Sequence, residues 1–399
     1  MSENEKAEMN GGVNGSESNL SQWIPIPNDK LLYISSCARL LSLDNGFCPF
    51  ACTGMFVGKY CNNSQASKNV FTVLIHDRIQ GEVSYKTKMV EIEGVQCTSN
   101  DALKTKISCV ICNYYKDPYI LYMEPGSNHK KFLPLINRGT YCRVYAINTK
   151  LHELLNNFRK LDQNKDSKIN IIILGSGFDT TYFNLMSEGY SNIDVYEYDY
   201  KEIIDKKTKY ISKSKPLLDI INKNKNNYHL INCDITNNKL FSESLNNIKT
   251  GINDITIVIC ECLLVYIDEK TTIEMLSSLV KRFDNIYLLQ YDLIGPDDPF
   301  GNEMVENLKT RNIELRGFND VKNIEDQINR LKKVDLEDIN IVDMFHIYFK
   351  FLPMEERRRI ERLELMDEFE ELNLLQKHAC FGFGSKCKNE KFKNLISKI

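Results

Sequence analysis

The stretch "IIILGSGFDTTYFNL", residues 171–185, decides the fold, because it joins a short apolar run to two glycines and then to the start of a helix at Asp179 and Thr180. Gly175 and Gly177 follow the run directly, and glycines there allow backbone conformations that let a ligand approach the main chain. A dinucleotide site has a third glycine at the position of Thr180, which lets the helix pack closely on the strand. The stretch therefore favours an adenosine ligand without phosphates.

Short apolar runs of the same kind recur from residue 151 onward. They alternate with helical stretches or polar loops and cover Ile169–Leu174, Ile193–Tyr198, Tyr228–Cys233, Ile255–Cys260 and Ile286–Leu289. Runs this apolar indicate strands that are covered on both faces, and alternation with helices indicates parallel pairing. The sequence therefore predicts an α/β protein with a Rossmann-like, mostly parallel, doubly wound sheet and added helical and N-terminal segments. Its ligand is expected at the carboxyl ends of the strands.

Acidic side chains stand where these predicted strands end. Glu197 and Asp199 close the second strand, where one carboxylate is expected to hold a ribose, and the position at the strand end favours Asp199. Asp234 follows the third strand, where it can accept a hydrogen bond from an adenine amino group, and Glu261 and Tyr266 follow the fourth. Each residue alone is more often turn chemistry than a ligand site. Four ordered strand ends carrying Gly, Asp, Asp and Glu fit S-adenosyl-L-methionine better than NAD.

Net charge and cysteine content narrow the classes of partner and the cellular location that are expected. Lys+Arg 51 against Asp+Glu 54 gives a net charge of -3, which predicts neither nucleic acid nor an anionic membrane as a partner. Thirteen cysteines and an N-terminus without an apolar leader predict a reducing, cytoplasmic location. Cys109 and Cys112, together with Cys48 and Cys52, have the spacing of zinc ligands, but their surroundings favour buried thiols, so no metal is expected.

The chain divides into three parts by composition. Residues 1–22 are polar and predict a disordered tail. Residues 23–97 form an N-terminal extension without an assigned role, and its stretch at residues 69–95 has strand-like content and partial alternation. Residues 98–399 carry the strands and the candidate site.

One amphipathic helix is predicted near the end of the chain. The stretch "PMEERRRIERLELMDEFEELNLL", residues 353–375, has apolar residues three apart among dense charge: Ile360, Leu363, Met366, Phe369 and Leu372. Its charged positions are most simply a solvated face.

Several ordered blocks resemble the leucine carboxyl methyltransferases, a family that methylates the C-terminal leucine of the protein phosphatase 2A catalytic subunit. The resemblance covers residues 100–386, so that residues 98–399 form the expected methyltransferase domain. Its blocks are "KDPYI" (116–120), "INRGTYCRV" (136–144), "ILGSGFDTTYFNL" (173–185), "ECLLVYI" (261–267), "DPFGNEMVENLKTR" (298–311) and "VDMFHIYFKFLPMEERRRIERLELMDEFEELNLLQKHAC" (342–380).

The resemblance implies an S-adenosyl-L-methionine-dependent protein C-terminal leucine carboxyl O-methyltransferase. It implies that Lys106 and Arg143 hold carboxylate within the cofactor site and that Gly175 lines the methionine end of the cofactor. It further implies that Asp199 grips the ribose. The remaining implied contacts are Asp234 and Ile235 around the adenine and Glu261 at the cleft. Lys106 and Arg143 come from the family alone.

Other expectations concern the acceptor. Tyr266 and Arg138 are candidates for the leucine pocket, although an Arg after Asn in a loop can instead tie backbone carbonyls. The expected partner is the C-terminal tail of the phosphatase catalytic subunit, and the chain is expected to act as a monomer. Where the family has Y-E-Q, the chain reads "QYDLI", with Asp292 and Leu293 in place of Glu and Gln.

Three alternatives stay open at the level of sequence. The first is another carboxyl methyltransferase of the same superfamily, such as the wybutosine-synthesising enzyme of transfer RNA, whose repeat domain has no counterpart after "FGFGSKCKNEKF". The second is a phosphatase-binding protein that keeps the fold without the reaction. The third is an NAD-dependent dehydrogenase, which Thr180 disfavours.

Overall fold

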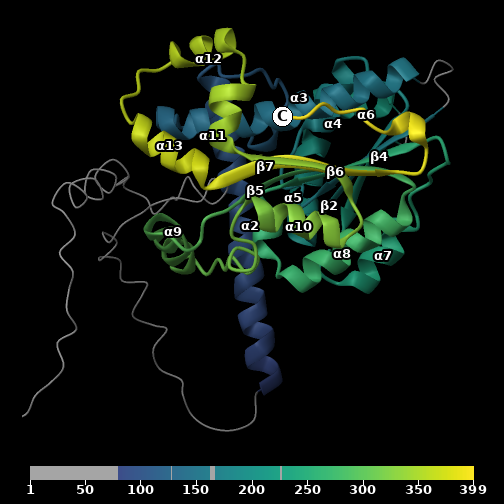
Figure 1. Ribbon diagram of the computed structural model, residues 1–399, viewed down its shortest axis with the longest axis horizontal. Coiled ribbons are helices and arrows are strands. Elements are labelled where there is room, and N and C mark those ends of the chain that lie inside the picture. The colour runs from purple at the N-terminus through teal and green to yellow at the C-terminus, as the bar shows by residue number, and fades with distance from the viewer. Residues whose placement is uncertain (1–79, 127, 162–166, 225–226) are drawn as a thin grey trace, which may run out of the picture. The chain divides into compact units, whose positions relative to one another are not determined.

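The computed structural model describes residues 80–126, 128–161, 167–224 and 227–399, with side chains from residue 94 onward (Figure 1). The predicted tail at residues 1–22, the predicted extension up to residue 79, and Cys48 and Cys52 lie outside the described residues. None of the helices in these ranges has the length and the apolar character needed to cross a membrane.

A seven-stranded sheet organises the described residues, in the order β3-β2-β1-β4-β5-β7-β6. The strands are β1 (Ile169–Leu174), β2 (Ile193–Asp199), β3 (Tyr228–Asn232), β4 (Ile255–Glu261), β5 (Asn285–Leu293), β6 (Glu337–Asp343) and β7 (Ala379–Cys387). Strands β1 to β5 pair in parallel, which confirms the predicted sheet and its five apolar runs. The strand order reverses between β1 and β4, and a ligand site is expected at this switch point.

The sequence did not predict the last two strands. β7 lies between β5 and β6 and is antiparallel to both. A Cβ atom at Gly382 would lie 2.3 Å from the carbonyl oxygen of Asn340 on β6, so this glycine allows the two strands to approach. The sheet is therefore mostly parallel with an antiparallel edge.

Helices cover both faces of the sheet (Figure 1). The longer ones are α2 (Gln80–Ile111), α3 (Pro134–Leu161), α4 (Thr181–Ser187), α5 (Lys201–Lys213), α6 (Lys215–Lys223), α7 (Asn238–Leu245), α8 (Glu269–Arg282), α9 (Pro299–Lys309), α10 (Ile324–Lys333), α12 (Met354–Glu361) and α13 (Phe369–Lys377). Short helical turns are η2 (Ile120–Met123), η3 (Leu264–Tyr266), α11 (Met344–His346), η4 (Ile347–Phe351) and η5 (Glu390–Phe392). One core joins α3, α4 and α6 to the sheet, and a second joins α7, α8 and α10 to its other face.

Helix α2 corrects one expectation. The strand-like stretch at residues 69–95 is helical from Gln80 onward, and the helix continues through the predicted domain boundary at residues 97–98. The stretch mixes β-branched residues with Glu, Lys and Met, so its local preference between strand and helix is weak. The C-terminal half of α2 lies against α3, where the Ser108 hydroxyl donates to the side-chain oxygen of Asn137 at 2.8 Å.

The predicted amphipathic helix at residues 353–375 is wrong in one respect. The chain forms two helices, α12 and α13, with a break between Glu361 and Phe369. A spacing of three falls short of the helical period of 3.6, so the apolar positions drift around one long helix. The break lets Ile360 and Leu372 both be buried, whereas Leu365 between them is 99% exposed.

Candidate functional site

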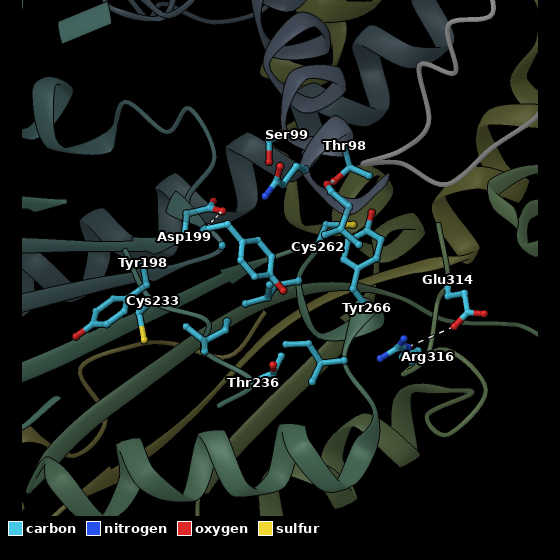
Figure 2. Close-up of a pocket in the computed structure, with 17 residues that line it drawn as sticks. Thr98, Ser99, Tyr198, Asp199, Cys233, Thr236, Cys262, Tyr266, Glu314 and Arg316 are labelled. Atoms are coloured by element: carbon cyan, nitrogen blue, oxygen red, sulfur yellow. Dashed lines mark hydrogen bonds and ion pairs between the residues drawn. The ribbon is translucent and has the colours of Figure 1, made fainter. Parts of the chain in front are cut away.

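A pocket opens at the carboxyl ends of β1, β2, β3 and β4. Its lining residues are Val95, Gln96, Thr98, Ser99, Gly175, Tyr198, Asp199, Tyr200, Cys233, Ile235, Thr236, Cys262, Leu263, Tyr266, Ile267, Glu314 and Arg316. Figure 2 shows Asp199 and Tyr266 on opposite sides of this pocket, with Thr98 and Ser99 of α2 above it. A second pocket shares Thr98, Ser99, Gly175 and Cys262 with the first and reaches Lys106 and Glu261. We call these two connected spaces the cleft.

The glycine turn forms one wall of the cleft. Gly175 has φ +60° and Gly177 has φ +54°, so both adopt the left-handed conformation that the sequence assigned to glycine. The side chain of Asp179 accepts from the backbone N–H of Thr181, the first residue of α4, at 2.8 Å. Thr180 replaces the third glycine and donates to Asp117 at 2.5 Å, so it ties the turn to the "KDPYI" segment.

Gly175→Ala is expected to weaken cofactor binding about tenfold. A side chain at φ +60° is strained, and the added Cβ would lie 2.7 Å from Leu263 Cδ1, so the turn or the Leu263 side chain at the pocket wall must move. Titration calorimetry with S-adenosyl-L-methionine measures the effect. Gly189→Ala is the control, because Gly189 also has a positive φ, +82°, a Cβ atom added there would meet no atom within 4 Å, and the residue lies outside the cleft. Equal affinities of the two variants would contradict the prediction.

Asp199 is the residue predicted to bind the ribose. One carboxylate oxygen accepts from the Gly177 N–H and the other from the Tyr200 N–H, each at 2.7 Å. Burial raises the pKa of Asp199, and these two hydrogen bonds oppose that rise. Each carboxylate oxygen has a second lone pair, so a pair of ribose hydroxyls can still donate to it.

Glu197, the alternative to Asp199, lies outside the cleft. It is fully buried, forms an ion pair with Lys207 and accepts from the Tyr228 hydroxyl at 3.0 Å. The Lys207 ammonium also donates to the carbonyl oxygen of Asp179 at 2.6 Å. Of the two carboxylates, only Asp199 lines the pocket, so the structure favours Asp199 for the ribose.

Of the residues that follow β3, some line the pocket and Asp234 does not. Ile235 lines the pocket, as do its neighbours Cys233 and Thr236. One oxygen of Asp234 accepts from the backbone N–H and the hydroxyl of Thr236, at 3.0 and 2.6 Å. Asp234 is not among the lining residues of either pocket, and its contact with adenine stays a prediction.

Two cations meet one carboxylate at the far end of the cleft. Lys106 of α2 donates to Glu261 Oε2 at 2.8 Å, and Arg143 Nε of α3 lies 2.9 Å from Glu261 Oε1. Burial tends to raise the pKa of Glu261, but the charges of Lys106 and Arg143 hold it below its ordinary value. Burial tends to lower the pKa of Lys106, and the carboxylates of Glu261 and Asp179 raise it instead. All three side chains are therefore charged at neutral pH.

Arg143 is fixed in place by its surroundings. Its side chain is 0% exposed, and its guanidinium lies 5.5 Å from the centre of the Tyr291 ring on β5. A guanidinium above an aromatic face gains from the negative face of the ring. The sequence could not place this contact, because Arg143 and Tyr291 are far apart along the chain.

The cleft fits S-adenosyl-L-methionine at both ends. In the cluster of Lys106, Arg143 and Glu261, two positive charges contact one negative charge, which suits a further carboxylate such as that of a methionine moiety. The other end presents Asp199 and the apolar side chain of Ile235, which suit a ribose and an adenine ring. The glycine turn lies between them. The predicted residues Lys106, Gly175, Asp199, Ile235, Glu261 and Tyr266 line the cleft and Arg143 belongs to the cluster, whereas Asp234 does neither.

Other sequence candidates lie elsewhere. Arg138 is 1% exposed and donates to the carbonyl oxygens of Glu361 and Glu364, at 3.4 and 3.0 Å. It therefore ties backbone carbonyls and does not line the cleft. Cys109 is buried and its thiol bonds the carbonyl oxygen of Asn137 at 3.2 Å. Among the described residues, His, Cys, Asp and Glu form no group of three that could hold a metal ion.

Sequence reasoning missed several lining residues. Tyr200 follows Asp199 directly and Leu263 stands inside "ECLLVYI", so both had a signal in neighbouring predicted residues. Thr98 and Ser99 lie in the middle of α2, and Arg316 lies in a segment after α9. Only the tertiary fold brings these three to the pocket.

The chain is similar to proteins of one family. The sequence model of the family described as leucine carboxyl methyltransferase matches residues 112–280. The leucine carboxyl methyltransferase 1 homolog of Arabidopsis thaliana is 32% identical over 73% of this chain and 88% of that protein. Leucine carboxyl methyltransferase 1 is 30% identical in Rattus norvegicus, over 74% of this chain and 90% of that protein. The Schizosaccharomyces pombe protein of the same name is 32% identical over 72% of this chain and 93% of that protein.

Solved structures also resemble the chain. A plantazolicin methyltransferase matches 72% of this chain and 98% of its own with 12% identity and a TM-score of 0.38. The sequence relatives are closer, and they extend over nearly their full lengths. On the strength of those relatives, this chain belongs to the leucine carboxyl methyltransferase family.

Proposed function

We propose that the protein methylates the C-terminal leucine carboxylate of the protein phosphatase 2A catalytic subunit. The cluster of Lys106, Arg143 and Glu261 carries the proposal, because it places two cations beside a cleft that fits S-adenosyl-L-methionine. The chain is a methyltransferase of the leucine carboxyl family, and S-adenosyl-L-methionine is its cofactor, as the sequence predicted.

The acceptor needs no general base. An α-carboxyl group has a pKa of about 3.5, so it is already a carboxylate at neutral pH. When bound, S-adenosyl-L-methionine supplies an electrophilic methyl group on a sulfonium. The task of the chain is to orient a carboxylate oxygen toward that group and to exclude water, and such orientation can contribute about 7 to 11 kcal/mol.

Arg143 and Lys106 are proposed to serve this orientation from the donor side, because they hold the carboxylate of the methionine moiety and so fix the direction of the sulfonium methyl group. A guanidinium fork and an ammonium bind carboxylate oxygens directionally. Arg143 is buried and the Lys106 side chain is 17% exposed, so a low local dielectric strengthens their interaction with a carboxylate. Tyr266, at the pocket wall, is proposed to lie beside the acceptor.

Ester formation also favours product release. The carboxylate becomes a neutral methyl ester, so the charge-assisted hydrogen bonds that it makes to the protein are lost. Hydrogen bonds to charged groups contribute about 1.5 to 3 kcal/mol each, so the ester binds more weakly than the acid.

The proposed setting follows the sequence expectations. The phosphatase tail is the proposed partner, with the enzyme acting as a monomer in the cytoplasm and without nucleic acid or membrane partners. The cysteines at the nine described positions are free thiols, which suits a reducing compartment.

Transfer of labelled methyl tests the proposal. The phosphatase catalytic subunit is incubated with the protein and labelled S-adenosyl-L-methionine, with and without its terminal leucine. We expect label on the intact subunit alone, and mild alkali should release it, because an ester hydrolyses. Equal labelling of the truncated subunit would contradict the proposal.

A further inference from the structure

The turn Cys262–Ile267 is a wall of the cofactor pocket. Cys262, Leu263, Tyr266 and Ile267 all line the pocket. Cys262 has φ +53°, so the chain turns sharply as it leaves β4. A left-handed cysteine costs free energy and persists only where the surroundings hold it. The contacts that hold this turn therefore bear on the shape of the pocket.

Asp292 provides one of these contacts. Its carboxylate oxygen Oδ1 accepts from the backbone N–H of Val265 at 3.2 Å, in the middle of the turn. One residue earlier on β5, the carbonyl oxygen of Tyr291 accepts from the Cys262 N–H at 2.7 Å. The turn is thus fastened to β5 by a side chain and a backbone group in succession.

Arg330 of α10 completes the arrangement. Its Nη1 lies 3.6 Å from Asp292 Oδ2, and its Nε donates to Glu269 Oε2 at 2.7 Å. Glu269 is the first residue of α8. It follows the turn Cys262–Ile267 and Asp268, which caps the N-terminus of α8. Arg330 is 0% exposed, so its ion pairs are held in a site of low dielectric.

Asp292 and the cation cluster lie on opposite faces of the sheet. Tyr291 and Leu293 pack in the core that includes α3, whereas the side chain of Asp292 faces Arg330 and α10. Successive side chains of a strand point to opposite faces, so this division follows from the position of Asp292. Asp292 is 1% exposed and cannot reach an acceptor bound near Arg143.

We propose that Asp292 and Arg330 are positioning residues, which hold the turn Cys262–Ile267 against the cofactor through β5 and α10. The replacement of the family's Glu by Asp292 then bears on the cofactor wall and not on the acceptor. The inference rests on the proposed function only in taking S-adenosyl-L-methionine as the methyl donor. Binding of this donor can be measured without any acceptor.

Asp292→Ala tests the proposal, with Gln290→Ala as the matched control. Gln290 is 0% exposed and lies two residues earlier on β5, where it bonds Gln327 at 3.0 Å and not the turn. Titration calorimetry should show a dissociation constant for S-adenosyl-L-methionine about tenfold higher in Asp292→Ala than in Gln290→Ala, because a buried N–H loses its acceptor. Asp292→Asn keeps an acceptor oxygen and should restore most of the affinity.

Steady-state kinetics separates positioning from acceptor binding. In Asp292→Ala we expect the KM for S-adenosyl-L-methionine to rise about tenfold, while kcat and the KM for the phosphatase subunit stay within about twofold. Equal cofactor affinity in the alanine variants at 292 and 290, or a rise confined to the acceptor KM, would overturn the proposal. If Asp292→Ala does not fold, Arg330→Gln replaces it, with the same expected rise and the same contradiction.

Discussion

Arg143→Ala is expected to reduce methyl transfer by about a hundredfold or more. The substitution removes a fully buried guanidinium that contacts Glu261 and lies over the Tyr291 ring. Without this guanidinium the methyl donor is no longer held in place, and a misplacement of about 1 Å can cost a factor of about 100 in rate. Lys106 alone would then neutralise Glu261, so no positive charge would remain for a further carboxylate. The kcat/KM for labelled methyl transfer to the phosphatase subunit measures the loss.

Arg138→Ala is the matched control for Arg143→Ala. Both arginines are buried on α3, but Arg138 bonds the carbonyl oxygens of Glu361 and Glu364 outside the cleft. Both variants should unfold at a lower temperature, and only Arg143→Ala should lose activity per folded molecule. Normal methylation by folded Arg143→Ala would remove the role assigned to this residue.

Asp199→Ala is expected to weaken cofactor binding most, by a factor of about 10 to 100. A carboxylate that accepts from ribose hydroxyls contributes charge-assisted hydrogen bonds of about 1.5 to 3 kcal/mol. The same substitution removes the acceptor of the Gly177 and Tyr200 N–H groups, so the glycine turn also loosens. Titration calorimetry with S-adenosyl-L-methionine gives the dissociation constant directly.

Asp194→Ala controls for the loss of a carboxylate from the same strand. Asp194 lies near the start of β2 and pairs with Lys168 at 2.7 Å, away from the cleft. Its substitution should leave cofactor affinity within about twofold of the wild-type value. An unchanged affinity in Asp199→Ala would refute the ribose assignment.

Local sequence patterns predicted the central, parallel part of the sheet. The apolar runs that became β1, β2, β4 and β5 are buried on both faces, as their composition predicted, whereas β3 at the edge of the sheet is only partly buried. The left-handed φ values at Gly175 and Gly177 likewise follow from a requirement that glycine meets best. Asp199 could be placed because it stands at the end of its strand.

Long-range packing decided what the sequence did not predict. β7 is antiparallel because it returns from α13 to lie between β5 and β6, and no local pattern encodes that return. Lys106 reaches Glu261 from α2, 155 positions earlier in the chain, so only family resemblance suggested it. The contact of Asp292 with Val265 is of the same kind, since its partner is 27 residues away.

The position of the transferred methyl group tests the central claim most directly. The phosphatase catalytic subunit is incubated with the protein and S-adenosyl-L-methionine, and its C-terminal peptide is fragmented in a mass spectrometer. The account predicts a peptide heavier by one methylene group, with the added mass on the terminal leucine carboxylate, and no such product with Arg143→Ala. An unmodified C-terminal peptide, or a methyl group on a side chain, would contradict it.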